Sequence, residues 1–278
     1  SWTDHAVLLT VAKVAKRTLI LEVMTDNYGR CRAVTTLDGK AAPVLLPGSF
    51  MELHCTNDGF GEPLQAKLLD ISGGIIASSR NDIGLQVLAA AKDLMVTLLQ
   101  EEDPAPEIYD VTYDLMTSLV GEDKRWPYHY AALEFAVMCE LGLVHGIEVA
   151  RPAFRQGETI YLSPKTGTVV TREQAGAFLD RMIPMPGMLM GKKNANVAED
   201  RQALELTGII LERFALPKAG ADNLMESRVP VLNAFRRVRE IPRAQVTEQR
   251  PRVDEEARRR RLMSSKPLMV ASRSIGGQ

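Results

Sequence analysis

The sequence predicts an α+β protein with three parts: an N-terminal five-stranded barrel, an α-helical domain and an irregular basic C-terminal tail. Up to about residue 75, short runs rich in Val, Leu, Ile and Thr alternate in polarity between turn residues, as strands do. From Asn81 onward the apolar residues recur at helical spacing. Beyond Ile241 almost no apolar periodicity remains. The expected parts are residues 1–78, 79–235 and 236–278.

The first part contains five candidate strands, at residues 6–14, 18–25, 30–37, 44–55 and 64–71. Asn27 and Gly29 lie between the second and third, and both residue types tolerate a positive φ and favour a hairpin. Pro47 and Gly48 interrupt the fourth run, which indicates a bend or a bulge. Five short strands are too few for two covered sheets. They suit a small closed barrel, which at this size would be an OB-fold; an SH3-like barrel is the alternative.

Helices are predicted over residues 81–100, 106–121, 127–142 and 198–215. Two more are expected to begin at residue 171 and at about residue 222. The first has an apolar stripe made of Leu85, Leu88, Ala91, Met95, Leu98 and Leu99. Pro106 and Pro127 each open a helix, because a proline is tolerated in the first turn.

The later helices are predicted from their boundary residues. Thr171 and Gln174 form a capping-box pattern at the start of the fourth helix. Pro217 is expected to end the fifth helix, and Pro230 must start, kink or end the sixth.

Two segments lack clear periodicity. Residues 146–170 are mixed and turn-rich, and could form a small hairpin from residues 159–162 and 168–170. The Met-rich residues 182–190 could be an adaptable docking surface or core filler.

Composition limits the class of protein. No run approaches the ~18 uncharged apolar residues of a membrane span, so we expect a soluble protein with no membrane partner. Three widely spaced cysteines indicate a reducing compartment and not a disulfide scaffold. The first residues have neither the layout of a signal peptide nor that of a transit peptide.

No catalytic or metal-binding motif is recognisable. The segment from Gly187 to Lys192 has three residues between its glycines instead of the four of a P-loop, and no Ser or Thr follows its lysine. G-x-G-x-x-G and G-x-S-x-G are absent. The four histidines and three cysteines share no metal-ligand spacing. We therefore expect a protein that is not an enzyme, with no cofactor and no metal.

Charge favours a nucleic-acid partner. Residues 1–80 are balanced, with eight basic and eight acidic residues, whereas residues 236–278 carry twelve basic and five acidic ones. A basic tail suggests an anionic partner, most commonly nucleic acid, although it could be a solvated appendage.

An OB barrel binds single strands along a basic groove and stacks bases on aromatic side chains. Arg30 and Arg32 are two apart on one strand and should share a face. The predicted nucleic-acid-binding residues are Lys13, Lys16, Arg17, Arg30, Arg32, Lys40, Lys67, Arg258, Arg259, Arg260 and Arg261. The candidate aromatics are Trp2, Tyr28, Phe50 and Phe60. The alternative is that these charged turns are simply solvated.

Several segments, taken together, resemble the RecO family of bacterial DNA-repair proteins, in its alphaproteobacterial type. The order and spacing of the matches cover roughly residues 1–230. The matching segments are WTDHAVLL at 2–9, MTDNYGR at 24–30, VLLPG at 44–48, LEFAVMCELGLV at 133–144, YLSPKTGTVVTRE at 161–173, RMIPMP at 181–186 and LTGIILE at 206–212.

The resemblance implies an OB-fold followed by a helical domain, and a non-enzymatic role in the bacterial cytoplasm near the nucleoid. Such proteins bind single- and double-stranded DNA and anneal complementary strands. They also dock on the C-terminal tail of single-strand DNA-binding protein, and with RecR they help load the recombinase.

The chain departs from the family pattern in three respects; the second predicts that no zinc is bound, and the first and third suggest a second hypothesis. Residues 35–42 hold one lysine and an aspartate where family members usually carry arginines, residues 145–160 lack the cysteines with which some members bind zinc, and the basic tail is longer. The alternative is a RecO-derived structural component of a ribonucleoprotein such as an organelle ribosome. It would bind ribosomal RNA and ribosomal proteins in the mitochondrial matrix.

Overall fold

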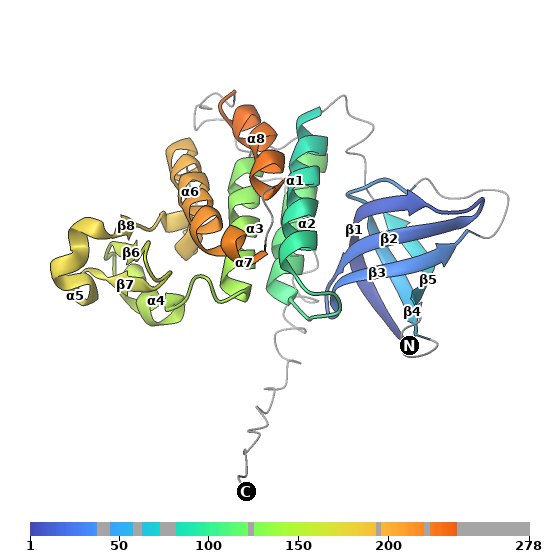
Figure 1. The fold of residues 1–278 in the computed structure, drawn as a ribbon, viewed down its shortest axis with the longest axis horizontal. Coiled ribbons are helices and arrows are strands. Elements are labelled where there is room, and N and C mark those ends of the chain that lie inside the picture. Colours follow the sequence, from blue (N-terminus) through green and yellow to red (C-terminus); the bar gives the residue numbers. More distant parts are fainter. Residues whose placement is uncertain are drawn as a thin grey trace, which may run out of the picture. The chain divides into compact units, whose positions relative to one another are not determined.

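The computed structural model describes residues 1–37, 45–57, 63–72, 82–121, 125–192, 196–219 and 223–237 (Figure 1). All of these lie in one compact unit, Ser1–Arg239. The predicted binding residues Lys40, Arg258, Arg259, Arg260 and Arg261 lie outside the described residues, as does Phe60. No helix in the described ranges combines the length and apolarity needed to cross a bilayer.

The N-terminal part is a closed five-stranded barrel, which confirms the predicted OB-like fold. Its strands pair in the order β1-β2-β3-β5-β4, and only β3 and β5 are parallel. The strands are β1 (Trp2–Lys13), β2 (Thr18–Thr25), β3 (Gly29–Thr36), β4 (Phe50–Thr56) and β5 (Leu64–Ser72).

Two strand boundaries differ from the prediction by more than one residue. β1 begins earlier because Trp2 already pairs with Cys55 of β4. β4 begins only at Phe50, because Pro47 and Gly48 form a turn before it rather than a bend within it. Gly48 has a φ of 86°, which favours glycine, and its N–H donates to the Leu8 carbonyl.

The barrel residues serve two cores. Leu8, Leu21 and Leu53 point into the barrel and are fully buried there. Val7 and Met24 point outward, yet they are also fully buried, because they belong to the hydrophobic core of the helical part. Alternation along the strands therefore gives two apolar faces where the helices cover the barrel.

The main helices match the predicted ones in order, with one addition. They are α1 (Asp82–Leu98), α2 (Pro106–Val120), α3 (Trp126–Glu140), α4 (Ile147–Arg155), α6 (Val197–Ile210) and α8 (Asn223–Phe235); α5 (Arg172–Ala175) and α7 (Leu216–Ala219) are short. Helix α4 was not predicted, and Leu85 of the expected α1 stripe is exposed. Pro230 lies inside α8, so the helix neither starts nor ends there.

Pro217 does not end a helix, contrary to the prediction. A π-turn, Leu211–Ala215, follows α6, and the Leu216 N–H donates to the Leu211 carbonyl. The chain then continues as α7 with Pro217 inside it. Such single π-helical turns are rare and occur mostly within longer helices, where they interrupt the regular hydrogen-bond ladder without ending the helix.

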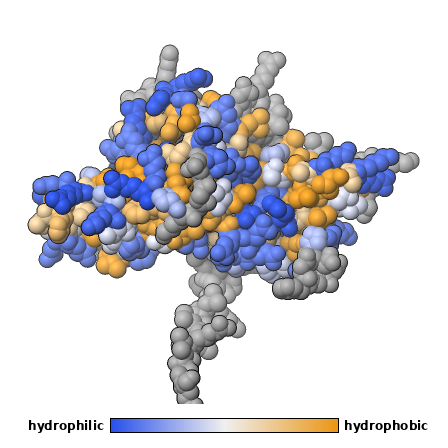
Figure 2. Space-filling view, viewed as in Figure 1, coloured by the Kyte–Doolittle hydropathy of each residue, from blue (hydrophilic) through white to orange (hydrophobic). Residues whose placement is uncertain are grey.

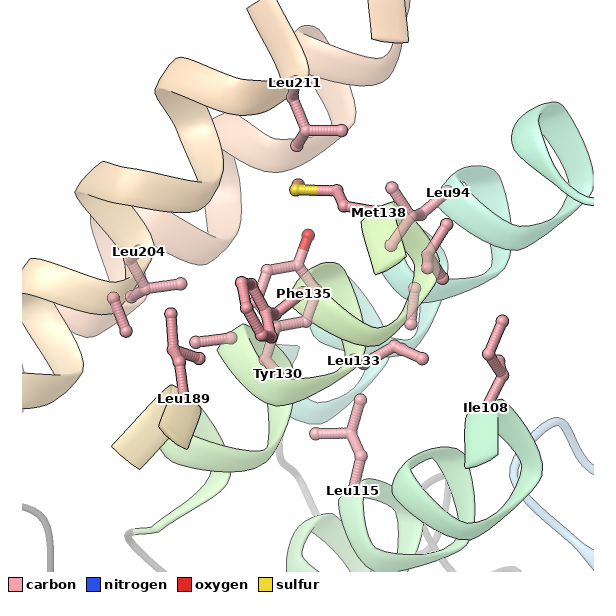
Figure 3. Packing of buried hydrophobic residues seen from close by; sticks show 14 of the residues in the cluster. Leu94, Ile108, Leu115, Tyr130, Leu133, Phe135, Met138, Leu189, Leu204 and Leu211 are labelled. Atoms are coloured by element: carbon pink, nitrogen blue, oxygen red, sulfur yellow. The ribbon is translucent and has the colours of Figure 1, made fainter. Parts of the chain in front are cut away.

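Helix α3 forms the centre of the helical core (Figure 3). Tyr130, Leu133, Phe135 and Met138 are buried although they point in different directions around the helix. A helix that is apolar on all sides is stable only when other elements surround it. Here α1, α2 and α6 all contact it.

A three-stranded sheet of order β7-β6-β8 lies beyond α4. β6 (Ile160–Leu162) and β7 (Val169–Thr171) form the predicted hairpin, and β8 (Ile183–Pro184) adds an edge. The predicted capping box of Thr171 and Gln174 is present at α5. In the methionine-rich segment Met185, Met188 and Met190 are buried, which favours core filler over a docking surface.

A buried ion pair joins two distant helices. Glu134 of α3 is fully buried, and Arg228 of α8 donates to it from Nε at 2.6 Å and from Nη2 at 3.1 Å. Arg228 also donates to the Leu204 carbonyl. Gly208 leaves room for the guanidinium, since a Cβ there would lie 2.8 Å from Nη1 of Arg228 and the guanidinium would have to shift.

Candidate nucleic-acid interface

The turn between β1 and β2 is basic and fully solvated. Lys13, Lys16 and Arg17 are all exposed, and none of them forms an ion pair with another described residue. Hydrophilic residues gather at this end of the barrel in Figure 2. In OB-folds the loop between the first two strands is one of the elements that contact oligonucleotides. The three cations therefore lie where a phosphate backbone can reach them.

Lys67 is a fourth exposed cation of the barrel. It lies on β5 opposite His54 of β4, with its neighbour Ala66 inside the barrel. Lys67 therefore points outward. β5 begins beside Ala33 and Val34 of β3, so Lys67 lies on a strand that neighbours the third strand, one of the two strands whose face OB-folds use for binding.

Arg30 is not available to a phosphate, which corrects the prediction. Its side chain is only 7% exposed and forms an ion pair with buried Glu22. It also donates from Nε and Nη2 to the Leu99 carbonyl, at 3.3 and 3.1 Å, and lies 3.3 Å from Glu101. The backbone closes the junction, because the Glu102 N–H donates to the Arg30 carbonyl at 2.8 Å. Arg30 thus ties β3 to the segment that follows α1.

Arg32 shares a face with Arg30 as predicted, because both reach the carboxylate of Glu22. It is 55% exposed, and its Nε lies 3.1 Å from Glu22 Oε2 and 4.0 Å from Glu101. The hydrogen bond and the charge of Glu22 raise the pKa of Arg32 above its usual value. Two carboxylates therefore offset the two arginines, and this face of β2 and β3 carries no surplus of positive charge.

The aromatic candidates separate into different environments. Trp2 and Tyr28 stack with ring centroids 4.1 Å apart and an interplanar angle of 12°, and Tyr28 is 37% exposed. Asp4 holds this hairpin by accepting hydrogen bonds from the N–H and Nδ2 of Asn27. Phe50 instead packs on Tyr113 of α2, at 4.5 Å between centroids, so it cannot stack on a base.

Acidic residues lie close to the Trp2–Tyr28 stack. The Asp4 carboxylate contacts Asn27, the residue before Tyr28, and the Glu101 carboxylate lies 3.3 Å from Arg30, two residues after Tyr28. Like charge repels phosphates, so the stack is a poorer place for a nucleic-acid backbone than the basic turn.

A groove of about 700 Å³ runs between α6 and α8. Its walls include Leu204 and Phe235, and its charged residues are Arg201, Glu205, Glu212, Arg228 and Arg236. Glu134 offsets Arg228 beneath the groove, and the exposed arginines and glutamates are equal in number. The groove therefore offers phosphates no advantage over the basic turn.

One buried carboxyl has a perturbed pKa. Asp200 of α6 is 9% exposed, and its Oδ1 accepts no hydrogen bond. Burial raises the pKa of Asp200 from 3.8 to about 6, although the charge of Arg125 lowers it. Within the described ranges, no group of three or more His, Cys, Asp or Glu side chains is placed to hold a metal.

Comparison with curated protein sequences finds relatives that share one name. No protein-family model matches the chain. A protein of Cereibacter sphaeroides (strain ATCC 17025) is 31% identical over 247 residues, covering 85% of this chain and 98% of its own length. Relatives from Ruegeria sp. (strain TM1040) and Sinorhizobium medicae are 29% and 28% identical, covering 85% and 80% of this chain and 98% and 89% of their own lengths. All three are named DNA repair protein RecO.

Proposed function

This chain belongs to the RecO family of DNA repair proteins, and we propose that it is a non-enzymatic recombination mediator. In this role it binds single-stranded DNA, promotes annealing of complementary strands and helps load recombinase onto coated strands. The observation that carries the proposal is the basic turn of Lys13, Lys16 and Arg17, which is exposed, forms no ion pair with any described residue and joins the first two strands of an OB-like barrel. Arg30 and the strand face beside it hold the barrel in place and contribute no free charge.

Binding by these cations is an exchange of counterions. Each phosphate neutralised on a single strand contributes about −0.7 to the slope of log affinity against log salt. Lys67 and the three turn residues then give a slope of about −3, which corresponds to roughly 50-fold weaker binding at 200 mM than at 50 mM salt.

The test is fluorescence anisotropy with a labelled oligo-dT strand over this salt range. The double variant Lys16→Ser, Arg17→Ser is expected to reduce the slope by about 1.4. The turn itself is retained, because it is held by backbone hydrogen bonds. The control variant Lys165→Ser, Arg172→Ser removes two exposed cations outside the barrel and leaves the slope unchanged. No binding at 50 mM salt, or equal slopes for both double variants, contradicts the proposal.

The proposed partners are single-strand DNA-binding protein, through its C-terminal tail, and RecR, in the bacterial cytoplasm at the nucleoid. Support comes from family membership. The test measures annealing of complementary strands coated with single-strand DNA-binding protein, either full-length or lacking its last residues. Annealing that requires the C-terminal tail supports single-strand DNA-binding protein as a partner. Equal annealing with and without the tail contradicts this partner.

A second candidate function is a structural nucleic-acid-binding role in a ribonucleoprotein such as an organelle ribosome, with ribosomal RNA and ribosomal proteins as partners. The neutralised β2–β3 face and the basic C-terminal residues favour it. Deleting residues 241–278 distinguishes the two functions. A mediator that relies on its barrel keeps most of its annealing activity, whereas a structural protein anchored by the tail loses its assembly.

A further inference from the structure

We propose that Val14, the first residue of the basic turn, is an apolar wedge that inserts against bases while Lys13, Lys16 and Arg17 hold the neighbouring phosphates. The preferred ligand is a junction at which a single strand meets a duplex. This inference rests on the proposed nucleic-acid binding and adds a residue whose contact is with bases and not with the backbone.

Val14 is unusually exposed for its position in the barrel. Its exposure is 56%, against 49% for Leu69 and 37% for Tyr28, the other large apolar residues exposed in the described barrel. Burial decreases steadily along β1, from fully buried Leu8 through half-buried Val11 to exposed Lys13. Only Ala12 and Lys13 at this end of the strand are exposed, and Leu19, which pairs with Lys13, still belongs to the barrel core, so the exposed turn begins directly where that core ends.

The turn is also rigid. The N–H groups of Val14 and Ala15 both donate to the Thr18 carbonyl, at 3.0 and 3.2 Å, and the Leu37 N–H donates to the Arg17 carbonyl at 2.8 Å. The turn is therefore fixed on both sides, by its own hairpin and by the end of β3. A β-branched side chain on a fixed backbone loses little entropy when it is inserted.

Turn chemistry does not account for this residue. Turns favour Gly, Asn, Asp, Pro and Ser, whereas here Val and Ala occupy the turn between cations. Proteins that distort DNA use this combination, since an apolar side chain enters between bases while basic residues hold the phosphates. Opening a base step costs least where pairing is already interrupted, which selects a junction over an intact duplex.

The experiment uses the full chain and a fluorescein-labelled junction with 2-aminopurine at the last paired position. Binding of wild-type protein is expected to raise 2-aminopurine fluorescence, because that base is unstacked. Val14→Ser should abolish the rise while weakening affinity by less than about threefold, since the three cations remain. Val14→Leu should keep the rise. Leu69→Ser, which removes the next most exposed apolar residue of the described barrel, on β5, should behave as wild type.

The outcomes separate the wedge from the proposed function. A rise in Val14→Ser equal to that of wild type, or saturating wild-type binding without any rise, overturns the wedge and leaves the nucleic-acid binding intact. If the wild-type protein does not bind the junction at all, the proposed function fails and the wedge fails with it.

Discussion

Methionine in place of Arg30 retains a long apolar side chain but removes the guanidinium. The donors to Glu22, Glu101 and the Leu99 carbonyl are lost together. Glu22 is only 4% exposed, and it would keep a single partner, the half-exposed Arg32. The change therefore leaves a buried carboxylate largely uncompensated at the junction between the barrel and the segment after α1.

The magnitude follows from the burial of each group. Removing one partner of a buried ion pair typically costs about 3–5 kcal/mol of unfolding free energy. Arg32→Met, at 55% exposure, should cost no more than about 1 kcal/mol. Adding Glu22→Gln to Arg30→Met removes the unpaired charge and should restore most of the loss, because replacing both members of a buried pair is often nearly neutral.

Urea denaturation followed by far-UV circular dichroism measures these differences in unfolding free energy. The affinity for single-stranded DNA is measured on the same protein preparations without urea, at a temperature at which the variants are folded. We expect Arg30→Met to lower stability strongly and to leave the affinity of the folded protein within about twofold of wild type, since no phosphate contact is lost. Unchanged stability together with weakened binding would refute the assignment of Arg30 to the junction.

Three further predictions concern the rest of the fold. Glu134→Gln should cost about 3–5 kcal/mol in urea denaturation, because Arg228 is then buried without a counter-charge; a loss below about 1 kcal/mol would contradict the buried pair. The pKa of Asp200 is higher in the folded than in the unfolded protein. The free energy of unfolding should therefore decrease as pH rises from about 4 to 6, and the ionised side chain remains destabilising above that range. Asp200→Asn should then raise the unfolding free energy at pH 7 by up to roughly 3 kcal/mol and flatten its pH dependence, and a less stable variant at pH 7 would oppose this. Gly29→Ala should lower the thermal midpoint, because φ is +69° and the added Cβ would meet the Asp103 carbonyl; an unchanged midpoint would count against that close approach.

Local signals predicted most of the barrel and helices. The second strand has the predicted bounds, Thr18–Thr25, because alternation and flanking turn residues both mark it. Helix α4 was missed although Ile147, Ala150, Ala153 and Phe154 recur at helical spacing, because the helix has only nine residues and Pro152 lies within it. Its start is marked only by Gly146 in the left-handed conformation.

The site was harder to predict because it depends on tertiary contacts. Alternation places Arg30 and Arg32 on one face of β3, but it does not show that the segment after α1 covers the first and leaves the second exposed. The role of Glu134 was likewise not predicted, because this residue lies within the mainly apolar segment 133–144. A carboxylate inside a helix that is apolar on all sides is itself a signal, because a buried charge requires a partner.

The distance along the chain between Glu134 and Arg228 has a consequence for biosynthesis. The two residues are 94 positions apart, and α8 also packs on α1. At typical translation speeds, on the order of ten seconds separate emergence of the last barrel strand from emergence of α8. During that interval the barrel has all its strands, whereas α3 still lacks the arginine that neutralises its buried carboxylate. Nascent chains stalled before α8 would therefore carry a completed barrel and an unsealed helical layer, the part that chaperones must shield.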